Sequence, residues 1–128
     1  MQFAKEMMEI RDALLKLGHE AIIPITTHQC VKQGGLNEDL NFCLENDVMI
    51  DHFNKVRDSE AILVLNYPKN DIKGYIGGSV LMEIAVAKYL GRKIFILHDL
   101  PSEKDLRYAL EIKVAAPVIL NGDLTKIK

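Results

Sequence analysis

A glycine-rich segment that runs into an apolar helix holds the residues best suited to chemistry. Residues 74–79 read Gly-Tyr-Ile-Gly-Gly-Ser, and the helix predicted over 79–90 contains a single acid, Glu83. Glycine lets the backbone approach a ligand closely, and a helix start offers unpaired N–H groups and the positive end of the helix dipole. Such a segment can hold an anion or keep a carboxylate ionised.

Glu83 has two readings that the residues alone leave open. Almost every other position around the 79–90 helix is apolar, so burial disfavours the charge while the helix dipole favours it. An ionised, poorly solvated carboxylate there suits a nucleophile or an electrostatic stabiliser. Equally, Glu83 could simply be an acid that complements the dipole at a helix start.

The remaining polar and aromatic residues give weaker signals. His28, Cys30, Cys43 and His52 match no standard zinc spacing, so we expect no metal and no cofactor. Tyr75 could stack on the ring of a ligand or cover the pocket, and equally it could anchor its loop by packing.

Helices and strands alternate along the chain. The strands are apolar runs without alternation, which is typical of a parallel sheet covered on both faces. Ligands in such folds bind at the carboxyl ends of the strands, where Asn66 and the loop 67–78 fall. The predicted helices are 3–17, 38–57, 79–90 and one within 101–112, and the predicted strands are 21–25, 61–65, 93–97 and 116–120.

Length and composition indicate one ordinary globular domain over residues 1–128. The formal net charge is −2, which gives no field favouring a nucleic acid polymer or an anionic membrane. No apolar run approaches the roughly 20 residues that span a bilayer. Two cysteines make no disulfide framework, so a cytoplasmic location with reduced thiols is the simplest expectation.

Three segments together resemble the nucleoside 2-deoxyribosyltransferase family and its relatives that hydrolyse deoxynucleoside monophosphates. The resemblance covers about residues 3–98, and its most specific part is the Gly/Ser-rich loop followed by a glutamate, Ala-x-Ala and a Gly-basic-strand sequence. The segments are Asp58 to Asn66, Gly77 to Ala87 and Gly91 to Leu97.

The resemblance implies a doubly wound, flavodoxin- or Rossmann-like parallel sheet whose first strand is missing from this chain. It implies cleavage or transfer at the N-glycosidic bond of a (deoxy)nucleoside or nucleoside 5′-monophosphate, with Glu83 as the nucleophile, and a homodimer or higher homo-oligomer. Asn66 matches a position where many members have aspartate, and Asp71 is the nearest candidate for a further acid. The implied substrate-binding residues are Phe3, Asn66, Tyr75, Gly77, Gly78 and Ser79.

A different class of function is compatible with the same residues. The fold and the anion-binding loop could serve a non-catalytic module that binds or senses a nucleotide or nucleotide sugar. Replacement of Glu83 separates the two, because it should abolish turnover by an enzyme and leave binding by such a module largely intact.

Overall fold

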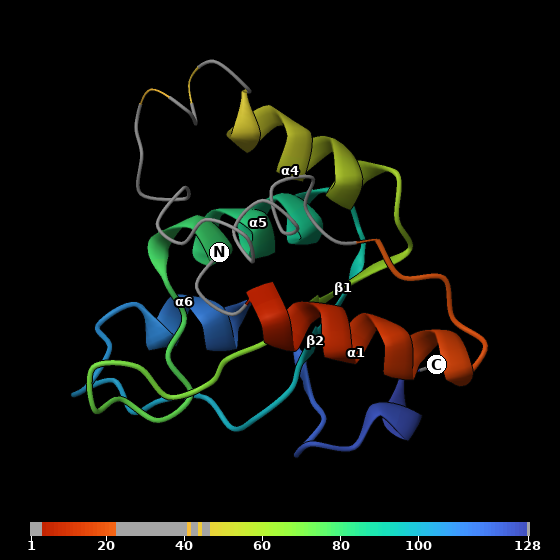
Figure 1. Cartoon of the computed structure of the whole chain (residues 1–128). Coiled ribbons are helices and arrows are strands. Elements are labelled where there is room, and N and C mark those ends of the chain that lie inside the picture. Colours follow the sequence, from red (N-terminus) through yellow and green to blue (C-terminus); the bar gives the residue numbers. More distant parts are fainter. Residues whose placement is uncertain (1–3, 23–40, 42–43, 45–46, 128) are drawn as a thin grey trace. The chain divides into compact units, whose positions relative to one another are not determined.

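The computed structural model describes residues 4–22, 41, 44 and 47–127 (Figure 1). The chain clusters into two compact units, Met1–Lys55 and Val56–Lys128. Phe3 lies outside the described residues, and every other residue expected to contact a substrate belongs to the second unit. The single domain over residues 1–128 stays a prediction.

The described part of the first unit is mostly helical. α1 spans Ala4–Lys16, within one residue of the helix predicted over 3–17, with Glu6 in its first turn and Lys16 in its last. Both charges complement the helix dipole. The described part of the predicted 38–57 helix contains α4, Val48–Arg57, whose last two residues belong to the second unit.

The second unit is built on a small parallel sheet. Its strands are β1 (Ala61–Val64), β2 (Lys93–Ile96) and β3 (Val118–Ile119), hydrogen-bonded in the order β1-β2-β3. Val64 pairs with Ile96 in register, and Phe95 pairs with Val118. The expected parallel α/β architecture is therefore present. The doubly wound arrangement stays a prediction, because residues 23–25 of the predicted 21–25 strand lie outside the described part.

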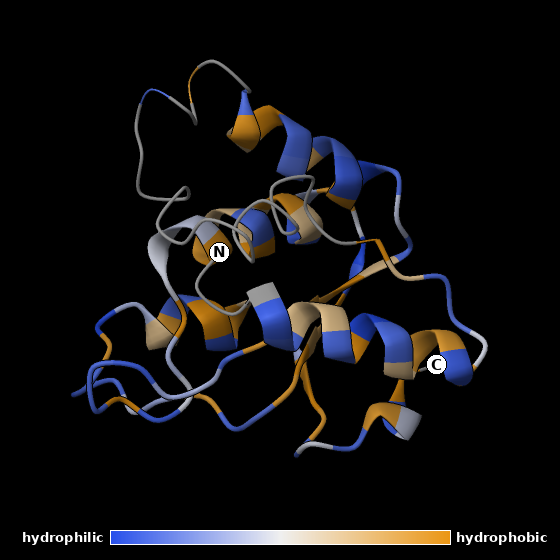
Figure 2. Ribbon diagram, in the orientation of Figure 1, coloured by the Kyte–Doolittle hydropathy of each residue, from blue (hydrophilic) through white to orange (hydrophobic). Residues whose placement is uncertain are grey.

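Two helices cover one face of this sheet. α5 (Gly78–Tyr89) links β1 to β2, and α6 (Ala109–Val114) links β2 to β3, before the short 3-10 helix η2 (Leu124–Lys126). One buried cluster joins the strands to both helices. Right-handed crossovers between sequential parallel strands place their helices on the same face of the sheet, which accounts for a single cluster. Figure 2 shows the strands in mostly hydrophobic colours. The cluster includes Val64, Ile84, Ala87, Ile94, Ile96, Ala109 and Ile112.

α5 differs from its predicted burial. Its inward stripe carries the fully buried Ile84 and Ala87, but Met82 and Tyr89 on the opposite side are 41% and 89% exposed. A helix packed on one small sheet buries only the stripe that faces the sheet, even when its other positions are apolar. α6 is also shorter than expected, because turns occupy most of residues 101–108.

Candidate functional site

The carboxyl ends of β1 and β2 are tied together by one side chain. Asn66 has no exposed surface, and its Nδ2 donates to the carbonyl oxygens of His98 and Asp99 at 2.9 and 3.1 Å. Its Oδ1 accepts from the backbone N–H of His98 at 2.8 Å. Both amide protons and the amide oxygen thus bond to the one backbone segment after β2, which gives Asn66 a positioning role at the strand ends.

The loop between β1 and α5 is ordered by a tight turn. Lys69 and Ile72 exchange both backbone hydrogen bonds, at 3.1 and 2.9 Å. Asn70 and Asp71 between them have φ of 52° and 61°, the pattern of a type I′ turn. Asp71, expected as a possible further acid, therefore lies exposed at the tip of this turn.

Gly74 is required where this loop passes the loop after β2. Its φ is +73°, and a Cβ built on it would lie 2.2 Å from the carbonyl oxygen of Asp99 and 3.3 Å from Nδ2 of Asn66. No side chain fits there. Gly74 and Asn66 together fix the path of the chain toward α5.

Tyr75 is anchored on two sides. Lys69 Nζ lies 5.4 Å from the centroid of its ring, a cation–π contact. The pKa of Tyr108 is raised, first by burial and then by the charge and hydrogen bond of Tyr75, so the two side chains interact. The Tyr108 hydroxyl also donates to the carbonyl oxygen of Ile76. The packing role foreseen for Tyr75 is therefore present, while stacking on a base remains a prediction.

The start of α5 is open. Gly77 is the N-cap residue in an extended conformation, and no side chain caps the helix. Among the described residues, a Cβ on Gly78 would meet no atom within 4 Å, and one on Gly77 would meet only a Tyr75 ring carbon at 3.8 Å. Neither residue has the left-handed conformation that favours glycine. In contrast to position 74, the described atoms therefore leave room for a side chain at positions 77 and 78.

Glu83 is the sixth residue of α5 and is half-buried. Ser79 lies one turn earlier, at the i−4 position, and is exposed. Side chains four residues apart share one face of a helix, and both tilt toward its start. Ser79 and Glu83 therefore line the same side of α5, which begins at the carboxyl edge of the sheet (Figure 1).

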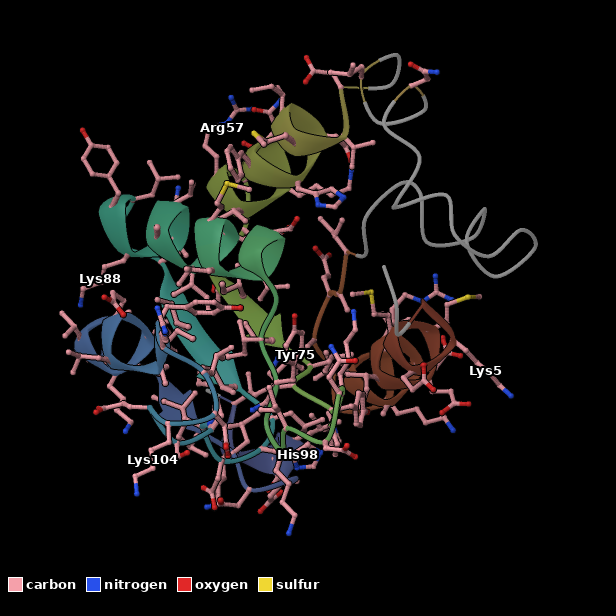
Figure 3. All side chains as sticks on the ribbon, turned by 90° about the vertical axis from the view of Figure 1, so that its left-hand side faces the viewer. Lys5, Arg57, Tyr75, Lys88, His98 and Lys104 are labelled. Atoms are coloured by element: carbon pink, nitrogen blue, oxygen red, sulfur yellow. The ribbon has the colours of Figure 1, made fainter. Side chains whose placement is uncertain are left out.

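Two residues at this edge were not predicted from the sequence. Tyr67, directly after Asn66, makes an edge-to-face contact with His98, with 5.6 Å between ring centroids and 63° between planes. A hypothetical Cβ on Gly122, after β3, would lie 4.0 Å from His98 Cε1. Figure 3 labels Tyr75 and His98. The only sequence signal for Tyr67 and His98 is that each follows the end of a predicted strand.

The described residues give no sign of a metal or a membrane-spanning segment. Among them, no three His, Cys, Asp or Glu side chains gather in a group that could hold a metal ion. His28, Cys30 and Cys43 lie outside the described residues. None of the described helices is both long enough and apolar enough to cross a bilayer.

The chain was also compared with known proteins. No family model, no curated protein and no solved structure matches it.

Proposed function

We propose that this chain cleaves or transfers the N-glycosidic bond of a (deoxy)nucleoside or nucleoside 5′-monophosphate. The observation that carries the proposal is the start of α5. No described side chain caps it, it holds two glycines that the described atoms do not require, and it presents a half-buried carboxylate on the face shared with Ser79. The proposal includes a doubly wound sheet, in which ligands occupy this edge.

The proposed chemistry is a retaining displacement at C1′ of the sugar. A carboxylate oxygen of Glu83 attacks C1′ while the C1′–N bond breaks, and the departing base takes a proton from an acid or from water. The resulting glycosyl ester is cleaved by water, which gives hydrolysis, or by a second base, which gives transfer. The same carboxylate stabilises the positive charge that develops on the sugar.

Each remaining site residue has a proposed task. The N–H groups at Gly78 and Ser79 receive the sugar or its 5′ group, since the helix dipole favours an anion there. The missing side chains of Gly77 and Gly78 leave space for that group. Tyr75 stacks on the base from a loop that Asn66 and Gly74 hold in place.

A nucleotide-binding module without turnover is the second candidate. It is favoured by the two positions where a further acid is expected. Asp71 is exposed on a turn tip, and position 66 carries an amide fully bonded to the backbone. Under this reading the anion site at the start of α5 is retained while bond cleavage is lost.

Chromatography of substrate mixtures tests the enzyme. Deoxynucleosides and deoxynucleoside monophosphates are incubated with the protein, with and without an added acceptor base. Glu83→Gln should lower base release by about a thousandfold or more, because it removes the nucleophile. Glu111→Gln, which changes an exposed acid on α6, should have no effect. Binding of a substrate without base release would favour the module, and absence of both would exclude the two proposals.

Glycine variants test the anion site separately from the fold. Gly77→Ala and Gly78→Ala should keep the melting temperature near that of the parent protein, because a Cβ meets open space or ordinary contact. Both should weaken substrate binding by about tenfold, a loss of about 1.4 kcal/mol. Unchanged binding by both folded variants would contradict the assigned site.

A further inference from the structure

A hollow lies at the end of the sheet opposite the proposed site. It has a volume of about 330 Å³ and is formed at the amino ends of β2 and β3. Its apolar lining comes from Ile94 and Phe95 on β2, Ala115 and Ala116 after α6, and Val118 on β3. A volume of this size is at the lower end of the range for small-molecule sites.

Three of the described cationic residues contribute to the wall of this hollow. They are Lys88, Arg92 and Lys93, from the end of α5 and the start of β2. Figure 3 shows Lys88 at the far end of α5 from the loop that carries Tyr75. Positive charge near the carboxyl end of a helix complements the helix dipole. This effect alone is enough to explain a lysine at position 88.

Arg92 carries a donor that has no partner in the part of the chain that the structure describes. One of its terminal nitrogens donates to the carbonyl oxygen of Arg57 at 2.6 Å, which satisfies the end of α4. Its Nε–H is buried and has no acceptor among the described residues. A buried donor without a partner is costly, so such a group calls for a ligand or water. Asp58, the neighbouring acid, is already bonded to Arg57 through both carboxylate oxygens, at 2.9 and 3.2 Å.

We propose that this hollow binds a small organic anion, with a carboxylate or phosphate group carried on an apolar body. The anionic group lies against the Arg92 side chain and within the field of Lys88. The apolar body packs on Ile94, Phe95 and Val118. Because the hollow is at the amino ends of the strands, its occupation is separate from the chemistry proposed for Glu83.

Titration of the isotope-labelled full chain, followed by amide NMR spectra, tests this site. The probes are benzoate and phenyl phosphate, which together distinguish a carboxylate from a phosphate. Benzamide supplies the same body without charge, and inorganic phosphate supplies charge without a body. One or both aromatic anions should shift the amides of residues 91–95 and 115–118, with a Kd of about 1 mM or tighter. Benzamide and inorganic phosphate should bind at least about tenfold more weakly.

Variants identify the anchor. Arg92→Gln should weaken binding of the better probe by about tenfold, through loss of the positive charge that lines the hollow. Lys88→Gln should weaken binding of the same probe about twofold. Because Lys88 is exposed, this variant should fold, so it tests the site even if Arg92→Gln does not fold. Lys104→Gln, on an exposed turn, is the matched control without effect.

Three results would overturn the proposal. One is the absence of shifts at 91–95 and 115–118 with either aromatic anion. Another is equal binding of benzamide, which would make the hollow merely apolar. The third is shifts confined to residues 77–80, which would assign anion binding to the start of α5 instead.

Discussion

Asn66 illustrates how the fold determines one residue type. Its amide donates to two carbonyl oxygens and accepts from one N–H, all on the segment after β2. An ionised aspartate in the same place can only accept, so it would face two carbonyl oxygens with no proton to offer. The amide is therefore the group that closes this junction, whatever the chemistry nearby.

Replacing Asn66 by aspartate should destabilise the protein strongly at neutral pH. We expect the free energy of unfolding to fall by about 3 kcal/mol, because a charge is buried with unsatisfied neighbours. The loss should be smaller below the ordinary aspartate pKa, where the protonated acid can donate again. Urea unfolding at neutral and acidic pH measures both effects.

Asn70→Asp is the matched control for that change. Asn70 is exposed and has a positive φ that aspartate also tolerates. The unfolding free energy of the Asn70→Asp protein should stay within about 0.5 kcal/mol of that of the parent protein. Equal stability of the Asn66 and Asn70 variants would show that the Asn66 hydrogen bonds contribute little.

Tyr108 should make stability depend on pH in the alkaline range. Burial and the neighbouring Tyr75 raise its pKa above the ordinary 10.0. A raised pKa means that this contribution to stability is complete below about 10 and is lost as pH rises through the folded value. The difference in unfolding free energy between the parent protein and Tyr108→Phe should therefore be constant below that pH and shrink above it. A difference that widens in alkali would refute the assignment.

At the scale of elements, the described helices α1, α5 and α6 are each followed by a residue with a positive φ, and after α6 that residue is not glycine. Gly18 after α1 and Gly91 after α5 have φ of 90° and 73°. Each is the left-handed residue of a Schellman motif. After α5, for example, the N–H of Arg92 donates to the carbonyl oxygen of Ala87 at 2.8 Å. After α6 the same place is taken by Ala116, with φ of 55°, and Pro117 has no N–H to complete the motif. Alanine pays a conformational cost there that glycine does not.

Ala116→Gly should accordingly keep or increase stability, by up to about 1 kcal/mol. Gly91→Ala, the reverse change after α5, should cost about 1 kcal/mol, since its φ of 73° is unfavourable for alanine. Thermal and urea unfolding of both variants provide the comparison. Destabilisation by Ala116→Gly would mean that the methyl group of Ala116 packs more favourably than the strain costs.

The elements that the sequence predicts well are those with strong local signals. α5 is displaced by one residue from its predicted 79–90 range, because Gly77 and Gly91 mark its ends. The apolar runs 61–65 and 93–97 contain β1 and β2. The exposed face of α5 has no such signal, since apolar residues occupy the whole helix and only the size of the sheet decides which of them are buried.

The candidate site is predictable only in part, for a related reason. The glycines, Ser79 and Glu83 are neighbours in sequence, so their spacing on a helix start is readable directly. The partners of Asn66 are backbone groups 32 and 33 residues away, and Tyr108 reaches Ile76 across 32 residues. Nothing in local sequence encodes a contact between a side chain and a distant backbone carbonyl, so these positioning groups emerge only with the fold.

At the scale of the whole molecule, burial is distributed unevenly between the two units. Among residues 5–16 of α1, whose burial is described, only Leu14 is buried, whereas Ile94, Phe95 and Ile96 on the central strand all are. Hydrogen exchange should therefore be slowest at β2 and markedly faster in α1, since exchange follows local burial and stability. Amide exchange measured residue by residue gives the test. Equal or slower exchange in α1 would show that the first unit is as stable as the sheet.

The short strand β3 has a consequence for how the protein behaves at high concentration. It lies at one of the two edges of the three described strands, contains two residues and follows Pro117. A long unpaired strand edge is a template for association with other chains, and brevity and proline are two of the ways in which natural sheets avoid it. The shortness of β3 and the proline before it thus protect this edge of the sheet from pairing with strands of other chains.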